Sequence, residues 1–260
     1  LISESANISY KQEGVEYIID DCVHVQEWNH IFPEKIDVIY HLAGNARIQP
    51  SFKNPLSIIR NNVLSTAAIC EFARHKSAKI IYAGSSSFYA GCKNSPYSFS
   101  KWQGEEICDM YNKIYGIEIA IARFFNVYGY RQPTHGKFAT VIGIFEKQYK
   151  NNEDLTIVGT GDQRRDFTHV EDICNGLISL STIQTEGIYN LGTGTNYSIN
   201  EIADIIIKNG NKDIKKKYIA ERRGEANETL ADISKIQLAT GWQARQNLKS
   251  YLINNVKHTN

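Results

Sequence analysis

The sequence predicts an α/β protein with a Rossmann-like, doubly wound parallel sheet and a smaller, discontinuous α+β lobe. Apolar runs alternate with helical patterns through the first half of the chain, and this alternation is typical of a parallel sheet covered by helices. Beyond Gly129 the pattern is less regular, and a loop rich in Pro, Thr, His and Gly appears. The smaller lobe is therefore expected to come from the later segments.

The first elements follow from apolar runs and their spacing. Strands are expected near 15–19 (VEYII) and 35–44 (KIDVIYHLAG), because each is a short run rich in β-branched and aromatic residues. A helix is expected over 56–74, followed by a strand near 78–87 (AKIIYAGSSS). This order of elements is that of strands joined by crossover helices.

The next helix begins in the stretch SPYSFSK and runs to Tyr115, because Gly116 is a natural C-cap. A buried strand, IEIAIARFFNVYG, comes after it. A helix through VIGIFEKQY and strands at LTIVG and EGIYNLGTG are expected next. Ser198 and Glu201 have the spacing of a capping box that opens the helix INEIADIIIK.

Composition narrows the class of protein. The 260 residues carry a net charge of +1 with both signs interspersed, which gives no field that favours nucleic acid or an anionic membrane. No apolar run approaches the ~20 residues that span a bilayer. The five cysteines lie far apart without metal-ligand spacing, which predicts no metal site and reduced thiols in a cytoplasmic compartment.

Small and hydroxyl-bearing residues follow the predicted strands, where open α/β sheets bind ligands. Ala43 and Gly44 end one strand, a serine cluster (85–87) ends the next, and Asn126 ends a third. Tyr97 and Lys101 stand four apart on one helix face, so both can point into one pocket. Since a phenol has a pKa near ~10, a nearby cation that favours the phenolate would make Tyr97 a usable base.

Eight segments in this order resemble the extended short-chain dehydrogenase/reductase family, in particular its nucleotide-sugar epimerases typified by UDP-glucose 4-epimerase. The segments are HLAGNARIQPSFKNP, Asn62-Val63, AGSSSFYAG, SPYSFSK, RFFNVYG, GTGDQRRDFTHVEDI, NLGTGTNYSINEIA and RRGEANETLADISK. The resemblance implies that Tyr97 is the catalytic base, that Lys101 lowers its pKa and binds ribose, and that Ser85 aligns the sugar. Ala90 stands where the family usually has Gly, so Ser86 and Ser87 remain alternatives to Ser85.

The resemblance also implies NAD as cofactor and a nucleotide sugar, in the first place a UDP sugar, as substrate. The cofactor-binding residues carried over are Asp21, Leu42, Ala43, Gly44, Asn62, Tyr97, Lys101 and Phe124. The substrate-binding residues carried over are Ser85, Asn126, Arg165, Arg222, Glu225 and Thr229. Guanidinium groups suit a diphosphate, and a carboxylate can accept hydrogen bonds from ribose hydroxyls.

The implied reaction is epimerisation at C4 of a hexose through a transient keto-sugar. A dehydratase or reductase of the same family is the enzymatic alternative, although serines stand here where family dehydratases carry Thr-Asp-Glu. No Gly-rich fingerprint occurs near residue 1, so we expect a fragment of a longer protein. A catalytically silent nucleotide-sugar-binding remnant is the other alternative.

The same resemblance predicts the organisation of the chain and its assembly. Residues 1–127 and 164–195 are assigned to the NAD-binding domain, and 128–163 and 196–260 to the nucleotide-sugar lobe. The helices over 56–74 and from SPYSFSK to Tyr115 each have two apolar faces. A homodimer joined through a four-helix bundle is therefore expected.

Overall fold

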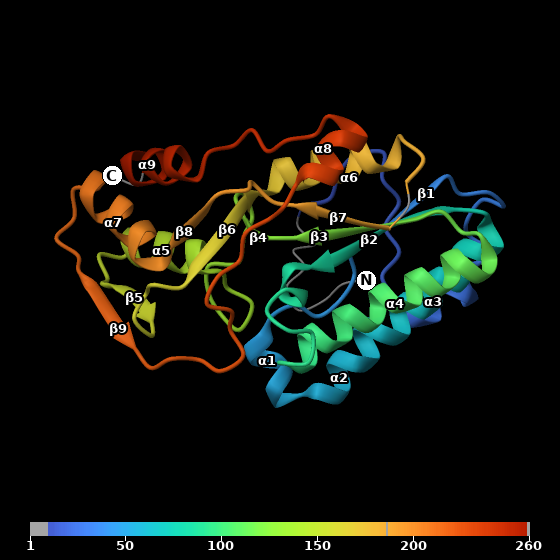
Figure 1. The fold of residues 1–260 in the computed structure, drawn as a ribbon, viewed down its shortest axis with the longest axis horizontal. Helices are drawn as coiled ribbons and strands as arrows, with labels where there is room; N and C mark the ends of the chain where they lie inside the picture. Colours follow the sequence, from blue (N-terminus) through green and yellow to red (C-terminus); the bar gives the residue numbers. More distant parts are fainter. Residues whose placement is uncertain (1–9, 186, 259–260) are drawn as a thin grey trace.

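The computed structural model describes residues 10–185 and 187–258, which form two lobes side by side (Figure 1). The larger lobe contains a four-stranded sheet whose neighbouring strands are all parallel, as expected. Its order is β1 (Val38–His41), β2 (Lys79–Ser85), β3 (Ile119–Phe124) and β7 (Gly187–Leu191). The α/β fold class is confirmed.

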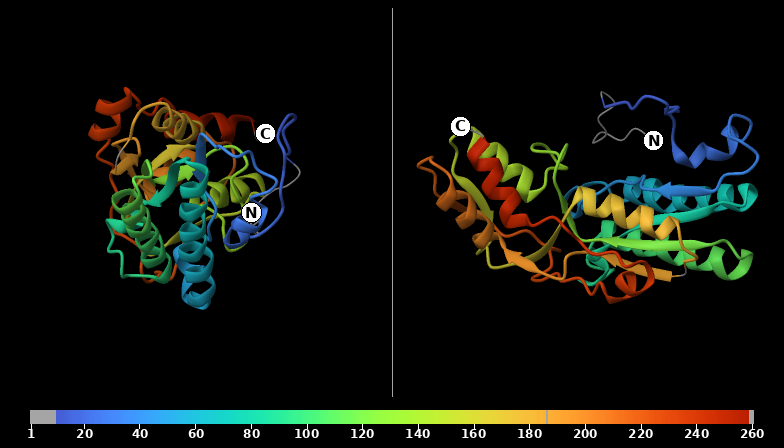
Figure 2. Two further views of the ribbon diagram at one scale, coloured as in Figure 1. Left: turned by 90° about the vertical axis from the view of Figure 1, so that its right-hand side faces the viewer. Right: turned by 90° about the horizontal axis from the view of Figure 1, so that it is seen from above.

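Helices cover both faces of this sheet (Figures 1 and 2). On one face α3 (Ser65–Lys76) and α4 (Pro96–Tyr115) bury side chains such as Phe72 and Cys108 against Ile80. On the other face α6 (Val170–Ser181) buries Leu177 against Ile81, and α8 (Ser234–Thr240) packs beside β7. Side chains of adjacent strand residues point to opposite faces, so β2 contributes to both cores.

The predicted strand near 15–19 is wrong. Residues 15–19 have no regular secondary structure, and Val15, Tyr17 and Ile19 are exposed. A strand needs a neighbouring strand for its backbone hydrogen bonds, and β1 pairs only with β2 among the described residues. The first regular element is instead the short 3₁₀ helix η1 (Cys22–Trp28), which Asp21 caps.

The helix predicted over 56–74 forms with one irregularity. It starts as α2 (Pro55–Ile59), widens into the π turn η2 (Arg60–Leu64) and continues as α3. Asn54 caps α2 after the short helix α1 (Ile48–Lys53). A single π turn in an α-helix often marks a functional position.

Helix α4 begins and ends as its sequence predicts. The Ser95 side chain accepts a hydrogen bond from the Ser98 amide, and Gly116 closes the helix with φ of 68°. At Gly104 an added Cβ would collide with the Tyr82 hydroxyl. The absence of a side chain at this position allows α4 to lie directly against β2.

The smaller lobe has its own core. One sheet consists of β4 (Asn126–Tyr128), β6 (Arg164–His169) and β8 (Asn196–Ser198), and β5 (Leu155–Val158) pairs with β9 (Lys216–Ile219). Helices α5 (Val141–Lys150), α7 (Ile199–Asn209) and α9 (Leu248–His258) enclose an apolar cluster that includes Phe145, Leu155 and Ile202. The predicted capping box of Ser198 and Glu201 is present.

Neither a membrane-spanning helix nor a metal-binding cluster occurs among the described residues. None of the helices within 10–185 and 187–258 has the length and apolar character needed to span a bilayer. Over the same ranges, no group of three or more His, Cys, Asp or Glu residues is arranged to hold a metal ion.

Candidate active site

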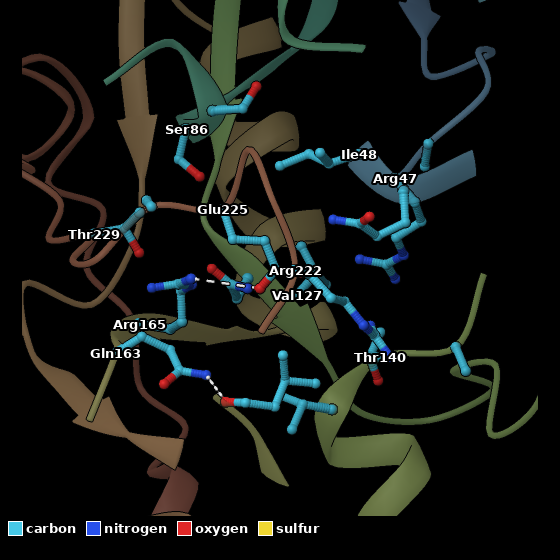
Figure 3. A pocket seen from close by; sticks show the side chains of 18 of the residues that line it. Arg47, Ile48, Ser86, Val127, Thr140, Gln163, Arg165, Arg222, Glu225 and Thr229 are labelled. Carbon is cyan, nitrogen blue, oxygen red and sulfur yellow. Dashed lines mark hydrogen bonds and ion pairs between the residues drawn. The ribbon is translucent and has the colours of Figure 1, made fainter. Parts of the chain in front are cut away.

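A cavity of about 470 Å³ receives side chains from both lobes (Figure 3). Of the residues implicated by sequence, it is lined by Ser85, Tyr97, Phe124, Asn126, Arg165, Arg222, Glu225 and Thr229. Phe124 lies at the end of β3, and Asn126 begins β4, which leads into the smaller lobe. The strand ends therefore bring the hydroxyls of one lobe to the guanidinium groups of the other.

Ser85 and Tyr97 are in contact. Ser85 is the last residue of β2 and caps the 3₁₀ helix η3 (Ser86–Phe88), its hydroxyl accepting from the Ser87 amide. The Tyr97 hydroxyl donates to Ser85 Oγ at 3.3 Å. Ser86 and Ser87 also line the cavity, but among these serines Ser85 is the one that hydrogen-bonds Tyr97 in the described part of the chain.

Opposing effects act on the proton of Tyr97. Burial raises the pKa of Tyr97 most strongly, whereas the hydrogen bond with Ser85 and the charge of Arg47 lower that pKa. In the structure the cation acting on Tyr97 is thus Arg47, which differs from the expected role of Lys101. The Lys101 ammonium instead lies 4.2 Å from the centroid of the Tyr82 ring, where a buried cation meets the negative face of an aromatic ring.

Lys101 is a buried cation with unused hydrogen-bond donors. Burial lowers the pKa of Lys101 to about 8, although the carboxylate of Glu105 works in the opposite direction. Across the described residues its ammonium group has neither a hydrogen bond nor an ion pair; its contact is with the Tyr82 ring. Three free N–H donors beside Tyr97 on the same helix suit the hydroxyl oxygens of a ribose.

Asn62 fixes the loop that follows β1. Its Oδ1 accepts from the Asn45 amide at 2.7 Å, and its Nδ2 donates to the Asn45 carbonyl at 3.1 Å and to Ser100 Oγ at 2.9 Å. A Cβ at Gly44, whose φ is 155°, would lie 3.0 Å from Asn62 Oδ1. Asn62 lies in the π turn η2, so the irregular helix and the loop hold each other.

Most of the residues that the family resemblance assigns to cofactor binding lie outside the cavity lining. Leu42 is exposed and Ala43 is half-buried at the end of β1. Asp21 accepts a hydrogen bond from the Val23 amide and lies 3.8 Å from Arg60. The residues of this set that do not line the cavity are Asp21, Leu42, Ala43, Gly44, Asn62 and Lys101.

The smaller lobe supplies the cationic wall. The Arg165 guanidinium lies 3.9 Å from the Glu225 carboxylate, and its Nη1 donates to the Arg164 carbonyl at 2.9 Å (Figure 3). Asp166 points the other way along β6, and its carboxylate accepts from the amides of Thr193, Gly194 and Ala231. Arg165 and Asp166 thus serve different partners, because neighbouring strand residues face opposite sides.

Arg47 is a cavity residue that sequence reasoning missed. It lines the cavity between Ala46 and Ile48, and its Nε donates to the Phe138 carbonyl at 3.0 Å. Its φ is 86°, in the region that favours glycine and costs other residues about 1–3 kcal/mol. No residue type in this segment indicates a strained backbone, so the sequence carries no signal that Arg47 adopts a positive φ.

A buried ion pair between Glu105 and Arg123 was also missed. Glu105, one turn after Lys101, receives two hydrogen bonds from Arg123 Nε at 3.0 and 3.2 Å and one from Arg123 Nη2 at 2.6 Å. Glu105 and Arg123 are 3% and 5% exposed, so neither charge is solvated. The signal was an arginine inside the otherwise apolar strand β3, and its partner could not be identified from sequence.

His41 introduces a pH dependence at the end of β1. Burial first, and the charge of Lys101 second, lower the pKa of His41 to about 3. In the unfolded chain His41 takes up a proton below about pH 6.5, whereas in the folded protein it stays neutral until the pH approaches 3. The free energy of unfolding is therefore unaffected by His41 above about pH 6.5 and decreases as the pH falls toward 3. At about pH 5 we expect His41 to reduce the free energy of unfolding by about 2 kcal/mol.

The check is urea unfolding at about pH 5 and about pH 7.5. His41→Gln should flatten the difference between the two pH values by about 2 kcal/mol. His135→Gln, on an exposed loop, is the matched control and should retain the wild-type difference. Equal pH dependence in the wild type and His41→Gln would contradict the assignment.

Comparisons with known proteins identify the family of the chain. A family model described as the NAD dependent epimerase/dehydratase family matches residues 11–192. The chain is 35% identical over 257 residues to the "Putative UDP-glucose 4-epimerase" of Methanocaldococcus jannaschii, covering 94% of this chain and 82% of that protein. It is 31% identical to a UDP-glucuronate 4-epimerase of Thermodesulfobacterium geofontis, covering 90% and 76% of the two chains.

Solved structures share the fold. The UDP-glucose 4-epimerase of Thermotoga maritima superposes with a TM-score of 0.90 at 21% identity, covering 98% of this chain and 87% of that one. The UDP-glucuronic acid 4-epimerase of Bacillus cereus, in complex with UDP-glucuronic acid and NAD, has a TM-score of 0.80 at 28% identity, covering 93% and 79%. The chain therefore belongs to the NAD-dependent epimerase/dehydratase family.

Proposed function

We propose that the protein epimerises a nucleotide-activated hexose, UDP-linked in the first instance, at C4. The observation that supports this most directly is the hydrogen bond between Tyr97 and Ser85 in a cavity that Arg165 and Arg222 also line. A hydroxyl pair suits proton transfer at a sugar carbon, and the guanidinium groups suit a diphosphate. One cavity can therefore accommodate both ends of a nucleotide sugar.

The roles of the chain's own residues follow from this placement. Tyr97 removes the proton of the C4 hydroxyl, and Ser85 holds that hydroxyl and the phenol in line. Arg165 and Arg222 bind the diphosphate, Glu225 accepts hydrogen bonds from the nucleoside ribose, and Asn126 and Thr229 flank the sugar. Rotation of the keto-sugar in the cavity would expose its other face; return of the hydride to C4 on that face and of the Tyr97 proton to O4 would then invert C4.

NAD is part of the same proposal, and the residues present fit it. The unused donors of Lys101 suit a ribose, and the small residues Ala43 and Gly44 permit close approach of a flat ligand. Leu42, Asn62, Phe124 and Asp21 complete the proposed set. When bound, NAD supplies reversible acceptance of hydride from C4. The division into a cofactor domain (1–127, 164–195) and a sugar lobe (128–163, 196–260) belongs to this proposal. Its boundaries differ from those of the two lobes, because β6 lies in the sheet of the smaller lobe and α8 packs beside β7 of the larger one.

The test is incubation of the purified chain and NAD with UDP-glucose, UDP-galactose and their uronic acid counterparts, followed by NMR of the anomeric protons. The proposal expects each C4 epimer to be converted into the other without net change in NAD. Net reduction of NAD or a stable dehydrated sugar would support a dehydratase or reductase instead. Binding of nucleotide sugars without any turnover would support the catalytically silent alternative.

A homodimer through a four-helix bundle is also proposed. Apolar side chains are exposed on the two helices concerned, including Leu56 (76%) before the π turn and Ile114 (64%) on α4. A paired copy would cover them. Light scattering is expected to give twice the 29.5 kDa chain mass. Ile114→Glu should shift that mass to the monomer value, and a monomeric wild type would contradict the proposal.

A further inference from the structure

Arg47 lies on the wall of the cavity opposite Arg165 and Thr229 (Figure 3). The residue is half-buried, and within the described ranges its one hydrogen bond runs from Nε to the Phe138 carbonyl. That bond leaves the two terminal nitrogens of the fork, with four N–H donors, available to a ligand. Glu225, the one carboxylate among the described lining residues, lies beside Arg165.

The backbone at Arg47 is an independent observation. Its φ of 86° with ψ of 136° is a conformation that glycine adopts without strain and that arginine rarely adopts. Such strain persists where the surrounding structure over-determines it, and it gathers at binding sites. A strained arginine, hydrogen-bonded by its Nε and aimed along a cavity wall, is therefore a preorganised ligand site.

Arg47 immediately precedes α1, and α1 packs against α4, which carries Tyr97 near its start. Of the three guanidinium groups that line the cavity in the described part of the chain, Arg47 is the one that acts on the pKa of Tyr97. It therefore stands at the reacting end, assuming the proposed function, in which Tyr97 faces C4. The diphosphate is attached at C1, across the sugar ring from C4, and Arg165 lies on the cavity wall opposite Arg47 (Figure 3).

We propose that Arg47 is a specificity-determining residue that binds a carboxylate on the sugar close to C4, so that acidic nucleotide sugars are preferred over neutral ones. A guanidinium fork pairs with a carboxylate through two parallel hydrogen bonds. Two sources of this chemistry exist, the C6 carboxylate of a uronic acid and the lactyl ether of a muramic acid. In both sugars the carboxylate belongs to a substituent of a carbon next to C4: C5 carries the C6 carboxylate of the uronic acid, and C3 carries the lactyl ether of muramic acid.

The experiment compares UDP-glucuronate, UDP-N-acetylmuramate and UDP-glucose by calorimetric binding and by kcat/KM. The wild type should prefer an acidic sugar by about tenfold or more, since charge-assisted hydrogen bonds contribute on that scale. Arg47→Gln should reduce this ratio about tenfold, whatever it does to both substrates in common. Arg47→Gly, which suits the backbone conformation, provides a second variant that is expected to fold. Whichever acidic sugar shows the larger loss identifies the position of the carboxylate.

Arg131→Gln is the matched control, because Arg131 also has a positive φ (64°) but is exposed and stacks on Tyr10 outside the cavity lining. It should leave the ratio unchanged. An unchanged ratio in Arg47→Gln and Arg47→Gly, or equal affinity of the wild type for UDP-glucose, overturns the inference. Failure of every sugar to turn over would instead remove the proposed function, while the binding ratios would still report on Arg47.

Discussion

Replacing Tyr97 by Phe is expected to lower kcat about a thousandfold and to change nucleotide-sugar affinity by less than about threefold. Positioned proton transfer contributes roughly 10²–10⁴-fold to a rate, and Phe retains the ring but not the proton acceptor. The cavity wall keeps its shape because the ring is held on α4. An effect on kcat with little effect on binding is the signature of an interaction made in the transition state.

The measurement is the initial rate of C4 inversion by NMR, with affinity from calorimetry. Tyr111→Phe is the matched control, since Tyr111 lies on the same helix and its hydroxyl donates to Glu71 outside the cavity lining. It should retain the wild-type rate within about twofold. A Tyr97→Phe protein that keeps more than about a tenth of the wild-type kcat would show that another group moves the proton.

The second large effect is expected from Glu105→Gln. Removal of one partner of a buried ion pair leaves the other charge uncompensated and typically costs about 3–5 kcal/mol. The Arg123 guanidinium has few alternatives, because it is packed 3.7 Å from the centroid of the Phe88 ring. We therefore expect the free energy of unfolding to fall by about 3 kcal/mol or more.

Urea unfolding at neutral pH tests this, with Glu106→Gln as the matched control. Glu106 is the next residue of α4, is exposed and accepts from Trp102, so its substitution should change stability by less than about 0.5 kcal/mol. The double variant Glu105→Gln/Arg123→Met should recover part of the loss, because no orphan charge remains. Equal free energies of unfolding for Glu105→Gln and Glu106→Gln would contradict this role for the ion pair.

Much of the fold could be predicted because its signals are local. The limits of α4 follow from Ser95, Pro96 and Gly116, and the capping box of Ser198 and Glu201 needs only four residues of sequence. The parallel sheet follows from the alternation of strands and helices. The segment at 15–19 failed because pairing is not local: an apolar run becomes a strand only where a neighbour offers its edge.

The candidate site was predictable to the extent that motifs carry chemistry. The contact of Tyr97 with Ser85 agrees with the spacing of their motifs, and Arg165, Arg222 and Glu225 reach the same cavity. Contacts made by folding alone could not be predicted. The strain at Arg47, the seat of Lys101 on the Tyr82 ring and the partner of Arg123 each depend on residues far away in sequence.

Tyr97, Lys101 and Glu105 occupy successive turns of one rigid rod, α4. If α4 shifted or tilted as a rigid body, the phenol, the ammonium and the carboxylate would move together. The distances between these three groups would therefore stay the same. Such a shift would change only their position relative to β2 and β3. The ion pair of Glu105 with Arg123 holds α4 to β3, the strand that pairs with β2 next to Ser85. The ion pair therefore joins the contacts of Tyr97 with Ser85 and of Lys101 with Tyr82 in fixing the position of α4 on the sheet.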